Sequence, residues 1–232
     1  MSKPLFSIVI PAYNEEKTIA DCLKSVTNQT FPKNNYEVIV INNNSTDKTK
    51  TIAQKFPVRI VDEKKKGYVW AITRGAKEAK GKILAYTDAD TRVNKDWLKQ
   101  YAKVFADPQV LIAGGRAIFE PKFPYMKIIE PLLNSAYRIF KVYSGFNFAV
   151  RKKIYDQVGG FNTKINFNVD TDLFLRVKKI GKSIYLPNNK VITSSRHYRG
   201  LSGLFYPLKG ILNALYLLLF KKTIFYEFGD VR

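Results

Sequence analysis

The feature that most constrains the fold is a regular alternation of apolar strands and amphipathic helices in the first 90 residues. The strand segments are short, apolar and rich in β-branched residues, as in strands buried on both faces of a sheet. The helical segments place apolar side chains on one face. This alternation predicts an α/β fold with a mostly parallel central sheet flanked by helices. The expected strands cover 5–11, 36–41, 57–61 and 82–87, and the expected helices cover 14–29, a segment ending near 55, and 68–80.

Polar side chains follow three of these strands at their carboxyl ends. Tyr13 follows the first strand, the asparagine run 42–44 follows the second, and Asp88 and Asp90 follow the fourth. Ligands of open parallel sheets bind outside the carboxyl ends of the strands. We therefore expect these side chains to converge on one site, and this convergence favours an enzyme.

The Asp88-Ala89-Asp90 sequence predicts a cation site. Two carboxylates one residue apart can share a divalent cation, and carboxylates prefer Mg²⁺ or Mn²⁺. Such a metal would neutralise a departing diphosphate as a Lewis acid. Solvated acidic pairs are common, so the position directly after a buried strand gives the pattern its weight.

Three further candidates come from the second half of the chain. Asp170 opens an expected helix over 170–180 and is a candidate general base, whereas Asp172 is explained by the helix dipole. His197 is the single histidine and lies between Arg196 and Arg199. It is either a metal ligand or, with Arg196 and Arg199, a diphosphate contact. The other expected elements are helices at 95–106, 125–143 and 151–158 and strands at 110–119, 145–150, 184–186 and 190–193.

Charge predicts an anionic partner. The chain has 232 residues, which is enough for one hydrophobic core. It carries a net charge of +20, of which +7 falls on residues 1–120 and +13 on residues 121–232. Nucleic acid, anionic lipid or a phosphorylated substrate would each fit. No nucleic-acid-binding motif is present and the acidic pair would repel phosphates without a metal, so we expect no nucleic acid. The single cysteine, Cys22, and the absence of a leader pattern predict a reducing, cytoplasmic compartment.

The segment 201–232 is an apolar and basic tail that follows a domain expected over 1–200. Its apolar run 210–220, which follows Pro207 and Lys209, is about half of what spans a bilayer. A helix lying in the membrane interface, at the inner face of the membrane, is one interpretation. A helix packed on the protein's own core is the other.

Several motifs together resemble family 2 glycosyltransferases of the GT-A fold. The segments S-I-V-I-P-A-Y-N-E-E, Y-E-V-I-V-I-N-N-N-S-T-D, G-K-I-L-A-Y-T-D-A-D, V-G-G-F-N and D-T-D-L-F-L-R carry the likeness, which extends over about residues 5–200. The resemblance implies an inverting enzyme that moves a sugar from a nucleoside diphosphate donor to a hydroxyl or phosphate acceptor. It also implies Mn²⁺ or Mg²⁺ as cofactor. A glycan or a lipid-linked acceptor at an anionic membrane surface would both fit.

The resemblance also assigns roles by position. It implies that Pro11, Tyr13 and Glu15 flank the nucleotide and that Asn43 contacts the base. Asp88 would touch the ribose or the metal, and Asp90 would hold the metal. Asp170 would be the catalytic base, and His197 would reach the diphosphate or the metal.

Two residues depart from the family pattern. Asn43 replaces an acidic residue, which leaves the preferred base open, and Val169 replaces the glutamate that precedes the catalytic aspartate. An amide can still pair with a base edge, and Asp170 remains, so we expect activity. The alternative is a catalytically degenerate protein that binds nucleotide sugars.

Overall fold

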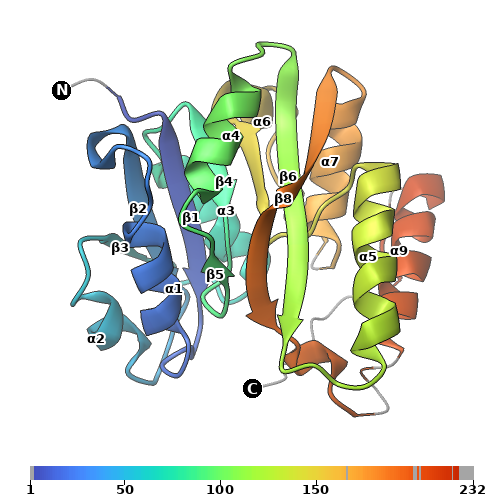
Figure 1. Cartoon of the computed structure of the whole chain (residues 1–232), viewed down its shortest axis with the longest axis horizontal. Helices are drawn as coiled ribbons and strands as arrows, with labels where there is room; N and C mark the ends of the chain where they lie inside the picture. Colours follow the sequence, from blue (N-terminus) through green and yellow to red (C-terminus); the bar gives the residue numbers. More distant parts are fainter. Residues whose placement is uncertain (1–2, 166, 201–202, 204, 221, 225–232) are drawn as a thin grey trace.

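The computed structural model describes residues 3–165, 167–200, 203, 205–220 and 222–224, with the side chain of residue 218 excepted. Within them, one eight-stranded sheet forms the centre of the molecule (Figure 1), in the order β3-β2-β1-β4-β7-β6-β8-β5. The strands are β1 (Phe6–Ala12), β2 (Tyr36–Asn42), β3 (Arg59–Asp62), β4 (Ile83–Tyr86), β5 (Arg92–Val93), β6 (Val110–Glu120), β7 (Phe148–Arg151) and β8 (Lys182–Ser194).

Helices cover both faces of this sheet, as Figure 1 shows. The α-helices are α1 (Ile19–Thr27), α2 (Thr49–Ala53), α3 (Tyr68–Glu78), α4 (Trp97–Phe105), α5 (Met126–Phe140), α6 (Lys152–Gln157), α7 (Val169–Lys178) and α9 (Tyr206–Phe220). Two 3-10 turns, Lys33–Asn35 and Arg196–Tyr198, complete the described elements.

The alternation of side chains along each strand builds two hydrophobic layers. Ile8 and Ile10 of β1 are fully buried with the apolar faces of α1 and α4, whereas Val9 between them is buried with α3 and α7. Successive side chains of a strand point to opposite faces, so a strand covered on both sides must be apolar throughout. The predicted α/β class with a single sheet is confirmed.

The first four strands follow the prediction in their pairing as well. β1 pairs in parallel with β2 and β4, and β2 pairs in parallel with β3. The second half is mixed, because β7 runs antiparallel to both β4 and β6. The two short strands expected at 184–186 and 190–193 form one strand, β8, which pairs with β6 across a bulge at Gly115/Arg116.

Helix α1 starts five residues later than predicted. Asn14 has a left-handed φ of 52°, and the residues that follow it form a loop instead of a first helical turn. Backbone N–H groups of this loop bond to side chains after β2, which compete with helix formation. The loop is therefore part of the site.

The predicted tail is helical where the structure describes it. Residues 201, 202, 204, 221 and 225–232 of the expected 201–232 segment lie outside the described residues. Helix α9 buries Asn213 and Leu217 and leaves most of its other large apolar side chains exposed. No helix in the described ranges has both the length and the apolar character needed to cross a bilayer.

Candidate active site

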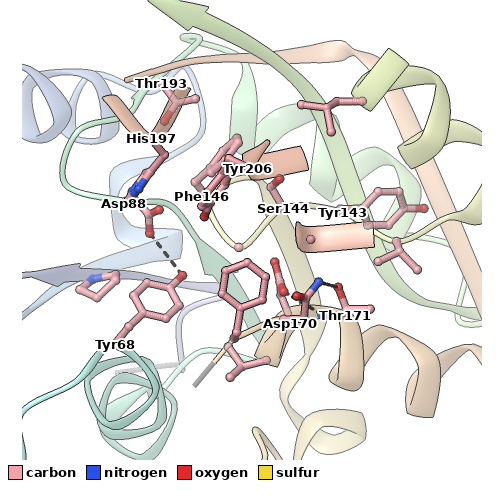
Figure 2. A pocket seen from close by; sticks show the side chains of 18 of the residues that line it. Tyr68, Asp88, Tyr143, Ser144, Phe146, Asp170, Thr171, Thr193, His197 and Tyr206 are labelled. Atoms are coloured by element: carbon pink, nitrogen blue, oxygen red, sulfur yellow. Dashed lines mark hydrogen bonds between the residues drawn. The ribbon is translucent and has the colours of Figure 1, made fainter. Parts of the chain in front are cut away.

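One cavity of about 990 Å³ lies at the carboxyl ends of the central strands. It brings together nearly all the predicted site residues, some of which Figure 2 labels. Arg199 is the exception, because it is exposed and does not line the cavity. The predicted residues that do line it are Pro11, Tyr13, Glu15, Asn43, Asp88, Asp90, Asp170, Arg196 and His197.

The loop after β1 is fixed by the polar run after β2. Ser45 Oγ accepts a hydrogen bond from the backbone N–H of Asn14 at 3.1 Å, and Thr49 Oγ1 accepts one from Glu15 at 2.7 Å. In return, Asn14 Oδ1 accepts the N–H of Thr46 at 2.8 Å. These bonds satisfy backbone donors that a helix would otherwise have used. They hold Tyr13 and Glu15 at the rim of the cavity.

The amide of Asn43 is occupied by the loop that precedes α3. Its Nδ2 donates to the carbonyls of Glu63 (3.0 Å) and Lys65 (2.7 Å), and its Oδ1 accepts the N–H of Gly67 (2.8 Å). Both amide protons are therefore used inside the protein. The sequence places Asn43 at the base contact, and the structure adds that it clamps the 63–67 loop, a role that only the fold reveals.

A buried ion-pair cluster lies beside the aspartates. Arg196 binds both oxygens of Glu15, at 2.5 and 3.1 Å, and also Asp90 Oδ2 at 2.9 Å. Glu15 is 6% exposed, so this contact satisfies a carboxylate that would otherwise be costly to bury. Glu15 acts here through Arg196, and the guanidinium provides a fixed positive charge at the predicted diphosphate position.

Asp88 and Asp90 are short of positive charge. Burial and the nearby Asp90 raise the pKa of Asp88 to about 8, against the opposing effect of Arg196. Burial also raises the pKa of Asp90. Tyr68 Oη donates to Asp88 Oδ1 at 3.4 Å (Figure 2). A cation beside these carboxylates would stabilise their charged forms, which burial disfavours.

The donor set fits a hard divalent cation that shares its coordination with a ligand. Among the described residues, no three His, Cys, Asp or Glu side chains form a ready metal cage. Mg²⁺ commonly binds to one or two carboxylates plus substrate phosphates instead of such a cage. Asp88 and Asp90 supply those carboxylates, and in Figure 2 the His197 ring points toward Asp88.

Asp170 lies in the first turn of α7 and faces the same cavity (Figure 2). Its burial raises its pKa to about 6, although the backbone N–H of Thr171 donates to Oδ1 at 2.8 Å and favours the charged form. A carboxyl group with this pKa can accept a proton near neutral pH. Asp172 instead pairs with Arg176 at 2.6 Å, and Val169 is buried in the core.

Several residues that line the cavity were not predicted from the sequence to be site residues. Tyr206 of α9 stacks on His197 with ring centroids 5.3 Å apart, and Lys66 lies 5.1 Å above the ring of Tyr13. Tyr68 opens α3 and reaches Asp88. The one signal in the sequence is the run of lysines at 64–66 before Gly67. Such a run could bind phosphate, although its default interpretation is a solvated surface charge. The position of Lys66 at the cavity depends on the loop that Asn43 holds.

The fold of the chain is that of the GT-A class. The profile of the family described as Glycosyl transferase family 2 matches residues 7–167. The chain therefore belongs to glycosyltransferase family 2, and the sequence-based assignment is confirmed.

Two curated relatives illustrate the likeness. The chain is 29% identical over 198 residues to Glycosyltransferase AglE of Haloferax volcanii, covering 78% of this chain and 64% of AglE. It is 30% identical over 208 residues to the Probable glycosyltransferase YdaM of Bacillus subtilis, covering 78% of this chain and 48% of YdaM. The chain thus spans about half to two thirds of the length of these relatives.

Solved structures show the same fold. The mannosyltransferase PcManGT of Pyrobaculum calidifontis, in complex with GDP-Man and Mn²⁺, matches with a TM-score of 0.69 and 22% identity over 83% of this chain and 57% of that one. TarS 1–349 of S. aureus, in complex with UDP-GlcNAc, matches with a TM-score of 0.66 and 20% identity over 82% of this chain and 58% of that one.

Proposed function

We propose that the chain is an inverting, metal-dependent glycosyltransferase that moves a sugar from a nucleoside diphosphate to a hydroxyl or phosphate acceptor. The observation that carries this proposal is the placement of Asp88, Asp90, Asp170 and Arg196 around one cavity. The PcManGT and TarS complexes support a nucleotide sugar as donor, and the Mn²⁺ of PcManGT supports a divalent cation.

In this proposal the donor lies across the strand ends. Pro11 and Tyr13 flank the nucleotide beneath the 63–67 loop, and Asp88 faces the ribose or the metal. Arg196 supplies positive charge beside the diphosphate. Arg199 lies exposed outside the cavity and would have to move to join it. Asp90 and His197 would hold Mn²⁺ or Mg²⁺, which when bound supplies Lewis-acid neutralisation of the leaving diphosphate.

Asp170 takes the proton of the acceptor in the same displacement. Its pKa of about 6 keeps the carboxylate ionised at neutral pH yet basic enough to accept that proton. The acceptor oxygen forms the new bond to the anomeric carbon on the face opposite the diphosphate. The bond from that carbon to the diphosphate oxygen breaks, and the configuration is inverted.

The acceptor is proposed to be presented at an anionic membrane surface on the cytoplasmic side. The excess of +13 in residues 121–232 and the exposed apolar side chains of α9 support this location. A soluble glycan acceptor is the second candidate, because the Asp170 side of the cavity carries polar groups such as Ser144 and Thr171 as well.

The test is release of nucleoside diphosphate from a panel of nucleotide sugars with Mn²⁺, measured for wild type, Asp90→Ala and Asp170→Asn. We expect selective release for the wild type and loss of at least about a hundredfold in each variant. Unchanged turnover in either variant would remove that residue from the mechanism. Tight nucleotide-sugar binding without turnover in the wild type would favour the degenerate binding protein.

A further inference from the structure

The cavity of the proposed active site continues into an apolar groove that the transfer chemistry does not use. Two helices far apart in the sequence form its walls, and Figure 1 shows both on the same side of the sheet. We call it the α5–α9 groove. Its principal lining residues are Leu133, Ala136 and Phe140 of α5 and Gly210, Ala214 and Leu215 of α9.

The size and lining of the groove fit an apolar ligand. The whole cavity, at about 990 Å³, is at the upper end of the roughly 300–1,000 Å³ typical of pockets for one small ligand. The donor is polar and belongs with the carboxylates and Arg196. The side chains that α5 and α9 place in the cavity are apolar or aromatic. Such a lining recovers free energy by removing hydrocarbon from water.

The groove opens to the outside on an apolar face. Ile211 and Leu215 both line the cavity and are 55% and 51% exposed. On the same two helices, Leu132 of α5 and Leu208 of α9 are also exposed, by 64% and 50%. Exposed apolar patches of this extent are uncommon on soluble monomers and mark contact with a partner or a membrane.

The charges around this face favour an anionic amphiphile. Lys127 and Arg138 of α5 and Lys209 of α9 are exposed, whereas Glu130, the one acidic residue of the two helices in the described chain, is buried and accepts the N–H of Phe119. Basic side chains that flank an apolar surface attract anionic headgroups while the apolar side chains contact the chains.

The wall of the groove is also fixed relative to the proposed base. Asn213 of α9 is fully buried, and its Nδ2 donates to Asn168 Oδ1 at 3.1 Å. Asn168 immediately precedes α7, whose first turn carries Asp170. A chain held against α9 would therefore be positioned with respect to Asp170.

We propose that the α5–α9 groove binds the hydrocarbon chain of an amphiphilic acceptor and directs its polar end to Asp170. This inference rests on the proposed function and narrows the acceptor to a lipid that carries a hydroxyl or phosphate head. The chain enters from the bilayer through the opening at Ile211 and Leu215.

The test uses n-alkyl phosphates from butyl to dodecyl, below their micelle concentrations, titrated by calorimetry into protein saturated with nucleoside diphosphate and Mn²⁺. Burying one methylene contributes about 0.8 kcal/mol, which corresponds to at most about a fourfold gain in affinity. We expect affinity to rise with chain length until the groove is filled. Affinity that does not depend on chain length would overturn the proposal.

Gly210→Leu places a larger side chain at a residue that lines the groove. A Cβ added at Gly210 meets no atom within 4 Å, and its φ is not left-handed. We expect this variant to lose at least tenfold in affinity for dodecyl phosphate while butyl phosphate and nucleotide binding stay unchanged. Ser135→Leu adds the same side chain at an exposed α5 position outside the cavity and is the matched control. Equal affinity for dodecyl phosphate in wild type and Gly210→Leu would overturn the proposal.

Two further outcomes separate the alternatives. In the first, the protein binds no nucleotide but still binds alkyl phosphates with an affinity that depends on chain length and that Gly210→Leu lowers. That result would contradict the proposed function while supporting the groove as a site for an apolar chain. In the second, light scattering shows a stable dimer that Leu132→Asn dissociates, and the affinity for alkyl phosphates does not depend on chain length. That result would assign the apolar face to a second copy of the chain and overturn the proposal.

Discussion

Asp170 is a carboxyl group whose surroundings raise its pKa to about 6, mainly through burial. The protonated form is thus favoured in the folded protein relative to the unfolded chain. The charged form therefore costs stability at neutral pH. This cost begins to fall as the pH drops through 6 and is gone only below the pKa of the unfolded chain, about 3.9. The same shift makes the carboxylate a competent base just above pH 6.

We predict that kcat/KM for sugar transfer rises with pH through an apparent pKa of about 6. Asp170→Asn should lower kcat at least about a hundredfold and should not lower Tm, because it removes a buried charge while the amide oxygen can still accept the Thr171 N–H. Initial rates from pH 5 to 8 and thermal melts provide both measurements. A pH-independent rate in the wild type would exclude Asp170 as the base.

The hydrogen bonds of the Asn43 side chain could not be predicted from the sequence. Its partners are backbone carbonyls and an N–H about 20 residues further along, so its use as a clamp depends on the placement of the 63–67 loop. Position in the motif indicated a base contact, and that role remains a prediction.

We predict that Asn43→Asp destabilises the fold by about 1–3 kcal/mol, because a carboxylate would face two carbonyls without a proton to donate. Donor binding should weaken as the loop loosens. Asn44→Asp is the matched control, since its Nδ2 bonds to the same loop from an exposed position. Urea unfolding of both variants measures the difference, and equal losses would contradict the clamp.

At the scale of elements, the parallel half of the sheet was predictable and the mixed half was not. Strands β1, β2 and β4 are mostly apolar, and helices separate the four parallel strands, which leaves little choice of pairing. The direction of β7 depends on its pairing with β4 and β6, and the fusion of two short strands into β8 depends on contacts with β6 across the bulge at Gly115/Arg116. No local pattern encodes either contact. The late start of α1 likewise depends on side chains after β2.

Close packing of α3 on β1 requires Gly75. A Cβ at Gly75 would lie 2.2 Å from Val9 Cγ1, which is fully buried. We predict that Gly75→Ala costs about 1–3 kcal/mol through overpacking. Gly210→Ala in α9 should instead gain up to about 1 kcal/mol of helix stability because it meets no neighbour. Urea unfolding of both variants tests the contrast, and equal effects would contradict the packing argument.

At the scale of the whole molecule, charge and exposed apolar surface lie in the same half of the chain. The +13 excess of residues 121–232 coincides with the exposed faces of α5 and α9, both of which line the cavity of the candidate active site. The sequence predicted the charge and the apolar tail. It could not show that α5 and α9 share one cavity, because they are separated by about 65 residues of β7, α6, α7 and β8.

We predict that the chain co-sediments with vesicles of phosphatidylglycerol and phosphatidylcholine more than with phosphatidylcholine alone, and less in high salt. Leu208→Asn with Leu212→Asn should weaken this binding at least about tenfold, because two apolar side chains no longer enter the interface. Ile180→Asn, an exposed isoleucine outside α5 and α9, is the control. Equal sedimentation of both variants would argue against α9 as the contact.

A metal-dependent donor site at the strand ends can be tested by thermal melting with UDP, GDP, dTDP and CDP, each with and without Mn²⁺. At a hundredfold excess over Kd, a bound nucleotide adds about 2.7 kcal/mol, or about 5–10 °C in Tm. We expect Tm to rise with a selective subset of these nucleotides and only with Mn²⁺, and we expect Asp90→Ala to remove the shift. No shift with any nucleotide in the presence of Mn²⁺ would contradict this prediction.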